Sequence, residues 1–264
     1  MAQPFVPRVG GILSADIAVP EHDREVRFYA RVLTTGDDPL WRDDLMNNAG
    51  LPIIGLGERT EETANLPLQW MPHIQVADVT ASVTRALELG GRELMHSRDA
   101  EGNSQWAVLL DPNGAAFGII PVVTPDAMPP TEETVSGNAV RVGRIAWVNL
   151  TVSDAAITRD FYQQVIGWSV HEVEMEHAGD RYFDFGMADS EGEPAAGVCH
   201  ARGTNGDLPP VWLIYLPVGD LDESLRRVEE EGGEVLRAAR GSDAGFAYAV
   251  VRDLVGACFA LIPG

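Results

Sequence analysis

The chain has 264 residues, 45% of them hydrophobic, and its 40 acidic residues against 19 basic ones give a formal net charge of −21. This length suits either one large core or two smaller ones. The strong negative charge would repel phosphate groups, so we expect neither nucleic acid nor an anionic membrane as a partner.

The sequence carries no recognisable signal for export or membrane insertion. No cationic stretch precedes an apolar one, and the apolar runs are far shorter than the roughly 18 residues that a membrane-spanning helix needs. Cys199 and Cys258 are the only cysteines, which suits a reducing compartment. We expect a cytoplasmic protein without a disulfide framework.

The first half opens with a loosely alternating strand over 12–19 and a helix over 21–33. Four residues of this helix have helical spacing and are expected to share one face: Val26, Tyr29, Ala30 and Leu33. Two short strands are then predicted, one near Leu45 and one over 53–56. The order is strand, helix and further strands.

A second group of the same type completes the first half. Its strand covers 68–76, and its helix stops at Gly90-Gly91, a typical end signal. Three more short strands are predicted near 93–95, 105–110 and 115–120. The pattern βαβββ therefore occurs twice in this half.

The second half repeats the first. Phe28-Tyr29 corresponds to Phe161-Tyr162, 133 residues further on, and Trp70 corresponds to Trp212 with a spacing of 142. Between the halves, residues 124–139 are rich in Pro, Thr, Glu and Gly without an apolar period, as in a linker. We predict two domains, over 1–123 and 140–264.

These elements predict an α+β fold made of four βαβββ groups. Two such groups whose sheets curl toward each other leave a cleft, which is the usual place for a small ligand. The pattern does not decide whether the groups pack within a half or across the halves. We expect a small-molecule ligand and a monomer or homodimer.

Four segments carry a resemblance to a known family. They are VSDAAITRDFYQQVIGW (152–168), LELGG (87–91), EEEGG (229–233) and DPNG (111–114). In this combination the chain resembles the vicinal oxygen chelate superfamily, which includes glyoxalase I, extradiol dioxygenases, fosfomycin-resistance enzymes and bleomycin-resistance proteins. The resemblance covers nearly the whole chain and implies two glyoxalase-like domains of the two-domain bacterial type.

Metal-using members of that superfamily carry a His on the first strand of a group and a Glu in the last strand. The positions that match the His are Ser14, Met71, Trp147 and Leu213. The positions that match the Glu after each Asp-x-x-Gly turn are Gly118 and Ala260. Only Ser14 offers even a weak oxygen ligand, so the resemblance implies a scaffold without the usual metal site. We expect no metal and no cofactor.

Several polar and aromatic residues are candidates for contact with a ligand. Trp147 and Asn149 share one face of a strand, and Asp16 holds the position of Asn149 in the first half. Filling of the vacated metal position by Trp147 is an equally simple interpretation. Tyr182 and Asp184 on a hairpin, with Asp44 as the first-half relative, are further candidates.

A second set of candidates ends a predicted strand or begins one. His200 and Arg202 share one face there, opposite Cys199, and Arg202 suits an anionic group; a surface cluster paired with nearby acids is the alternative. His73 suits proton transfer if it lines a cleft. Trp70 and Trp212 begin equivalent strands, and Tyr215 follows Trp212 by three residues. Trp212 and Tyr215 are therefore aromatic candidates, although core packing explains such repeated aromatic positions as well.

Two functions of different class remain. The first is a metal-independent protein that binds a small molecule, either a metabolite or an antibiotic, as bleomycin-resistance proteins do. The second is an enzyme, either a glyoxalase-like lyase or isomerase or a relative of the dioxygenases, with cleft acids and His200 or His73 as proton carriers.

Overall fold

The structure is a computed structural model that describes residues 7–33, 54–124, 145–240 and 246–264. Asp44, the strand predicted near Leu45 and nearly all of the predicted linker 124–139 lie outside these residues. In the described part of the chain no helix is long and apolar enough to cross a membrane.

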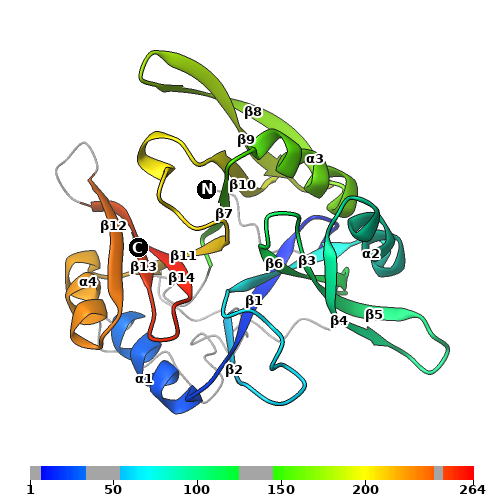
Figure 1. The fold of residues 1–264 in the computed structure, drawn as a ribbon, viewed down its shortest axis with the longest axis horizontal. Coiled ribbons are helices and arrows are strands. Elements are labelled where there is room, and N and C mark those ends of the chain that lie inside the picture. The colour runs from blue at the N-terminus through cyan, green and yellow to red at the C-terminus, as the bar shows by residue number, and fades with distance from the viewer. Residues whose placement is uncertain (1–6, 34–53, 125–144, 241–245) are drawn as a thin grey trace. The chain divides into compact units, whose positions relative to one another are not determined.

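The order of the elements confirms the α+β fold (Figure 1). The first group contains β1 (Ile12–Val19), α1 (His22–Leu33) and β2 (Ile54–Glu58). The second contains β3 (Met71–Val76), α2 (Val79–Glu88), β4 (Arg92–Arg98), β5 (Ser104–Leu110) and β6 (Ala116–Pro121). The third contains β7 (Trp147–Val152), α3 (Ala155–Ile166), β8 (Ser169–His177), β9 (Asp180–Ala188) and β10 (Pro194–His200). The fourth contains β11 (Trp212–Val218), α4 (Leu221–Glu230), β12 (Glu234–Arg240), β13 (Phe246–Arg252) and β14 (Cys258–Pro263).

Helix boundaries reproduce the internal repeat. Helix α3 begins and ends 133 residues after α1, and α4 begins and ends 142 residues after α2. An aspartate caps three of the helices and accepts a backbone N–H from their first turn, which is the chemistry preferred at helix starts. These caps are Asp78, Asp154 and Asp220.

The closest packing divides the chain into two compact units, each built from both sequence halves. Unit 1 contains the described residues of Met1–Leu13, Met71–Ala127 and Trp147–Trp212. Unit 2 contains those of Ser14–Trp70, Met128–Ala146 and Leu213–Gly264. The sequence had left this arrangement open, and the boundaries 1–123 and 140–264 stay a prediction about the repeat.

In unit 1 the strands follow the orders β3-β6-β5-β4 and β7-β10-β9-β8. Within each group the first strand runs parallel to the last, and the remaining neighbours are antiparallel. The helices of the two groups meet where the Ser82 hydroxyl donates to the Val165 carbonyl at 2.8 Å. Apolar side chains of both groups, including Phe117 and Phe161, are buried around this contact.

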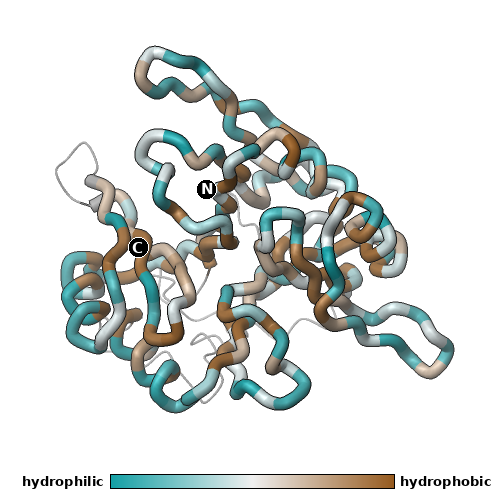
Figure 2. Tube along the Cα trace, in the orientation of Figure 1, coloured by the Kyte–Doolittle hydropathy of each residue, from teal (hydrophilic) through white to brown (hydrophobic). Residues whose placement is uncertain are grey.

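Unit 2 repeats these features. Its strands follow the order β12-β13-β14-β11, and β1 runs parallel to β2. Ser224 donates to the Val32 carbonyl at 2.7 Å, at the position where unit 1 has Ser82 and Val165. Figure 2 shows apolar residues concentrated in the inner strands of the groups, while the tip of the β8–β9 hairpin is mostly hydrophilic.

The Gly-Gly pairs after α2 and α4 have a packing role. A Cβ at Gly91 would lie 3.3 Å from the Phe161 ring and 2.9 Å from two carbonyl oxygens, and a Cβ at Gly233 would lie 2.9 Å from the Phe28 ring. Each second glycine therefore lets a phenylalanine from the other half approach the chain closely.

The buried face of α1 contains only part of the set of residues that the spacing placed on one face. Val26 and Ala30 are only partly buried, whereas Glu25, Phe28 and Val32 are buried together with Tyr29 and Leu33. The helix is rotated toward Glu25 because Phe28 packs against Gly233, a long-range contact that local periodicity does not contain.

Candidate functional site

The first and last strands of each group bring a larger side chain over a small residue. Because these strands are parallel and in register, the two residues of each pair face the same side of the sheet. The four pairs are Asp16–Gly55, His73–Gly118, Asn149–Gly197 and Tyr215–Ala260.

Two of these small residues, Gly118 and Ala260, hold the positions that the resemblance matches to the glutamate of metal-using members. Strand register adds Gly55 and Gly197 to the two positions found in the sequence. A Cβ at Gly197 would collide with the Asn149 carboxamide, and one at Gly118 would collide with the His73 imidazole. Neighbouring side chains therefore already occupy the space that a glutamate would need.

The first-strand positions do not compensate for this loss. Met71 is 3% exposed and Leu213 is fully buried, and neither offers an oxygen or nitrogen ligand. In the described part of the chain no group of three or more His, Cys, Asp or Glu side chains is placed to hold a metal ion. Among the described residues, these positions therefore offer no set of donors that fits the divalent ion of the family.

In unit 1 one face of β7, β10 and β9 gathers several of the predicted site residues. Thr151 lies opposite Cys199, and the register of β10 with β9 places Cys199 opposite Asp184. One step along the strands, Asn149 lies opposite Gly197, which lies opposite Gly186. We call this surface the β7–β10–β9 face.

Asn149 and Cys199 form a pair on this face. The Asn149 amide nitrogen lies 3.4 Å from the Cys199 sulfur. Burial raises the pKa of the Cys199 thiol to about 11, although the hydrogen bond with Asn149 acts in the opposite direction. The thiol is therefore protonated at neutral pH, and its environment does not activate it as a nucleophile.

Asp184 and His200 form a second pair. The Oδ1 atom of Asp184 accepts the backbone N–H of His200 at 2.8 Å and lies 3.2 Å from its ring Nδ1. The residue is 3% exposed, and its Oδ2 atom has no hydrogen-bond partner among the described residues. Asp184 thus orients His200, and its carboxyl also interacts with the neighbouring Cys199 thiol and adds to the effect of burial in raising the pKa of that thiol.

Tyr182 and Arg202 complete the end of this face. The Tyr182 ring lies edge-on to His200, with 5.7 Å between the centroids, and the Arg202 guanidinium lies 5.2 Å above the same ring. Arg202 is exposed, so this cation–π contact leaves its donors open to solvent. The structure brings these two candidates together with Asp184 and His200.

Trp147 and Asn149 share a face, as strand alternation predicts. A Cβ at Gly197 would lie 3.5 Å from the indole nitrogen of Trp147, so the indole borders the same glycine as Asn149. Thr151, which continues this series, was not among the predicted site residues. The period of two from Trp147 onward was the signal that could have found it.

The remaining candidates lie elsewhere. Trp212 is fully buried and donates its indole N–H to the Tyr162 hydroxyl at 2.9 Å, so it belongs to the core of unit 1. Tyr215 lies in unit 2 with its ring 6.2 Å from that of Tyr248. Asp16 and His73 lie over Gly55 and Gly118, on strands other than those of the β7–β10–β9 face.

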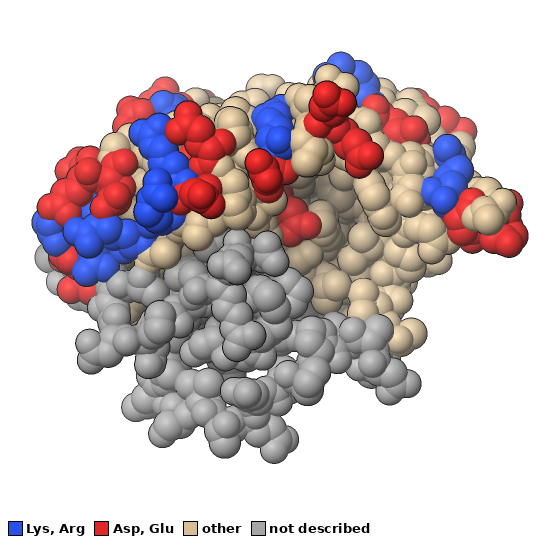
Figure 3. Space-filling view, turned by 90° about the horizontal axis from the view of Figure 1, so that it is seen from below, with Lys and Arg blue, Asp and Glu red and all other residues tan. Residues whose placement is uncertain are grey.

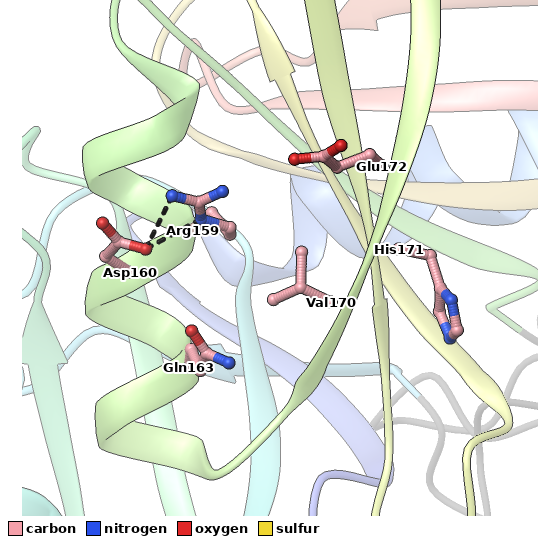
Figure 4. Close-up of a pocket in the computed structure, with 6 residues that line it drawn as sticks. All are labelled: Arg159, Asp160, Gln163, Val170, His171 and Glu172. Carbon is pink, nitrogen blue, oxygen red and sulfur yellow. Dashed lines mark hydrogen bonds and ion pairs between the residues drawn. The ribbon is translucent and has the colours of Figure 1, made fainter.

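A hollow of about 620 Å³ lies between α3 and β8 (Figure 4). Its lining is largely polar: Arg159, Asp160, Gln163, Val170, His171 and Glu172. The Arg159 guanidinium donates to Asp160 and lies 4.5 Å above the Phe185 ring. These contacts already engage its cation, so this hollow has weaker ligand chemistry than the β7–β10–β9 face.

Acidic and basic side chains are interleaved on the face in Figure 3. In unit 2, Arg226 on α4 pairs with Glu223 and Glu230, and Arg31 on α1 pairs with Glu230 at 3.5 Å. Such exposed ion pairs contribute little to the stability of the fold and do not by themselves indicate a ligand site.

Comparison with known proteins assigns both halves to one family. A glyoxalase-like domain model matches residues 14–120, and the model of the glyoxalase/bleomycin resistance protein/dioxygenase superfamily matches residues 144–259.

Two of the relatives illustrate the level of sequence identity. Anthracycline biosynthesis protein DnrV of Streptomyces peucetius is 28% identical over 172 residues, 64% of this chain and 57% of that protein. The match thus spans little more than half the length of that relative. CFP32 of Mycobacterium bovis, named provisionally as a glyoxylase, is 26% identical over 197 residues, 75% of this chain and 70% of that protein.

A solved structure shares the fold. Homoprotocatechuate 2,3-dioxygenase of Brevibacterium fuscum aligns with a TM-score of 0.56 and 15% identity over 98% of this chain and 82% of that one. Together with the four-group repeat, these matches show that the chain is a two-domain member of the vicinal oxygen chelate superfamily.

Proposed function

We propose that this protein binds a small organic molecule, a metabolite or an antibiotic, on the β7–β10–β9 face of unit 1 without the help of a metal ion. The observation that carries this proposal is the replacement of the family's ligand positions: the glutamate positions are glycine or alanine, and neighbouring side chains fill the space. The scaffold for a ligand persists, whereas the donors for an ion do not.

The chemistry of the face supports binding. It combines an aromatic side chain (Trp147), an amide (Asn149) and a carboxylate (Asp184) around positions without side chains. Small-molecule sites commonly pair apolar and aromatic surface with a few well-placed polar groups. The names of DnrV and CFP32 are compatible with a small-molecule ligand and do not identify it.

An enzyme is the alternative function, of the glyoxalase-like lyase or isomerase type or related to the dioxygenases. The Asp184–His200 pair favours it, because a carboxylate at Nδ1 orients a histidine so that its other ring nitrogen can transfer a proton. Proton transfer by this pair would act on the same bound molecule.

Two measurements on the full chain, purified without chelators, distinguish the two functions. The binding function predicts less than one-tenth of an equivalent of divalent metal by elemental analysis, and no turnover of the methylglyoxal–glutathione hemithioacetal above that of the His200→Gln variant. A stoichiometric metal, or turnover that His200→Gln abolishes, would overturn the binding function in favour of the enzyme.

A further inference from the structure

Two buried oxygen atoms on the β7–β10–β9 face have no hydrogen-bond partner among the described residues. They are Oδ2 of Asp184, in a residue that is 3% exposed, and Oγ1 of Thr151, in a residue that is 1% exposed. Buried polar atoms are nearly always paired, and an unpaired one indicates a missing water, ion or ligand group. Both atoms lie in one row across the sheet.

The spacing within this row limits the size of the missing group. Thr151 and Asp184 flank Cys199 on the strands to either side, so two strand spacings, about 10 Å, separate their backbones. A single water cannot bond to both oxygens across that distance. A small molecule one ring wide can approach both when it lies over the short Cys199 side chain.

The next row leaves room for a flat group only over Gly186. A Cβ at Gly186 would have no neighbour closer than 3.8 Å, whereas the Asn149 carboxamide already covers Gly197. The Tyr182 ring continues the series beyond Asp184 on the same strand, and flat rings stack well beside such side chains. The room for a ring therefore lies over Gly186 and Cys199, with the Asn149 carboxamide at its border.

The chemistry of the unpaired atoms fixes the polarity of the ligand. The free oxygen of an ionised aspartate can only accept a hydrogen bond, and a threonine hydroxyl can accept or donate. Asp184 already receives both hydrogen bonds from His200 on its other oxygen. The matching group is therefore an O–H or N–H donor.

Resting on the proposed binding function, we infer that the ligand is a flat ring that bears a hydroxyl or ammonium group, which donates a hydrogen bond to Asp184, with Thr151 bonding a second polar position on the ring. Anionic and purely apolar rings of the same size are excluded, because they leave the buried carboxylate unpaired or oppose it.

Four single-ring probes test this inference: phenol, benzylamine, benzoate and toluene. Each is titrated into the ¹⁵N-labelled full chain, and the amide shifts of Asp184, Cys199 and His200 report binding on the face. We expect phenol or benzylamine to bind at least tenfold more tightly than toluene and benzoate. Preference for phenol identifies a hydroxyl ligand, and preference for benzylamine identifies an ammonium ligand.

Variants connect the preference to the two oxygens. Asp184→Asn should reduce the advantage of the donor probes over toluene to less than threefold, and Thr151→Val should weaken phenol binding severalfold. Asp160→Asn, an exposed change on α3, is the matched control and should leave all affinities unchanged. Because Asn keeps an acceptor for the His200 N–H, Asp184→Asn should also keep the thermal midpoint, which checks the fold.

The outcomes separate the two proposals. If all four probes shift these amides with equal affinity, the ligand class is wrong and the binding function stands. If no probe shifts them at 10 mM, roughly the weakest affinity expected of a fragment this small, both proposals are contradicted.

Discussion

Each unit contains a buried chain of hydrogen bonds from a tryptophan to a tyrosine to an aspartate, which we call the corner. The two corners differ in the residues beside the aspartate. In unit 1, Trp212 donates to the Tyr162 hydroxyl at 2.9 Å, and that hydroxyl donates to Asp111 at 3.4 Å. In unit 2, Trp70 donates to the Tyr29 hydroxyl at 2.9 Å, and the hydroxyl donates to Asp253 at 2.7 Å. Each corner joins a helix, a tryptophan at or just before the start of a strand, and the turn before a last strand.

The difference lies next to the aspartate. In unit 1 the Asn113 amide donates to Asp111 at 3.2 Å and to the Thr158 hydroxyl at 3.0 Å. In unit 2 the repeat places Glu25 at the position of Thr158 and Val255 at that of Asn113. The Glu25 carboxyl is 1% exposed, and its Oε2 atom has no hydrogen-bond partner among the described residues.

The comparison shows that one scaffold holds a satisfied polar network in unit 1 and a strained acid pair in unit 2. Burial, followed by the charge of Asp253, raises the pKa of Glu25 to about 8, and burial raises the pKa of Asp253 to about 6. Arg24 opposes the shift at Glu25, while Glu21 adds to it. An unpaired buried carboxyl prefers to stay protonated.

Replacing Glu25 by a residue that cannot ionise should have the largest effect on the free energy of unfolding. Its folded pKa lies above its unfolded value of 4.5, so the folded state retains the proton over the window from about 4.5 to about 8. Stability therefore falls as pH rises through this window, by an amount on the order of 5 kcal/mol, and levels off above it. Denaturant unfolding at pH 5, 7 and 9 measures this loss.

Glu25→Gln is the matched variant, because it keeps the shape of the side chain and cannot ionise. It should unfold with nearly the wild-type free energy at pH 5 and should be several kcal/mol more stable than the wild type at pH 9. Titration of Asp253 adds a smaller decrease between pH 3.8 and about 6 in both proteins. An unchanged pH dependence in Glu25→Gln would show that another group is responsible.

Loss of the tyrosine hydroxyls should have the next largest effect, and it should differ between the units. Tyr29→Phe removes a 2.7 Å hydrogen bond to a largely ionised carboxylate, which should cost about 2–3 kcal/mol at pH 7. Tyr162→Phe removes a longer bond of 3.4 Å to a carboxylate that keeps other donors and should cost about 1–2 kcal/mol. Equal costs would mean that the two corners are energetically alike.

Much of the fold followed from the sequence because its signals are local or repeated. The helix boundaries of the two halves differ by the same 133 and 142 residues as the sequence repeat, and the predicted order of helices and strands is confirmed within the described residues. Which residues of α1 are buried did not follow from the spacing alone: Tyr29 and Leu33 are buried together with Phe28, which lies close to Gly233 of the other half. The strand predicted from Leu68 begins at Met71, since propensity fixes strand ends poorly.

The sequence predicted the candidate site only where the positions of its residues follow from alternation within a single strand. Alternation placed Trp147 and Asn149 on one face, and the structure agrees. The pairing of Asp184 with His200 depends on the register of β9 with β10, and the role of Gly197 depends on the register of β10 with β7. No local pattern encodes those registers, so the unpaired oxygen of Asp184 was invisible in the sequence.

The smallest expected effect on stability comes from changing Thr158, the residue of unit 1 that corresponds to Glu25 in unit 2. Thr158→Val keeps the size of the side chain but removes the acceptor for Asn113 and the donor to the Asp154 carbonyl, which Thr158 contacts at 2.9 Å. The cost should be about 1 kcal/mol and independent of pH between 5 and 9, because no ionisable group is lost. Denaturant unfolding of Thr158→Val beside Glu25→Gln measures both properties in one series. Burial also raises the pKa of Asp111, so the unit 1 corner has an acid of its own. A pH-dependent cost for Thr158→Val would indicate that breaking the network changes the protonation of Asp111, and the two corners would then differ less in their pH dependence than the contrast between Thr158 and Glu25 predicts.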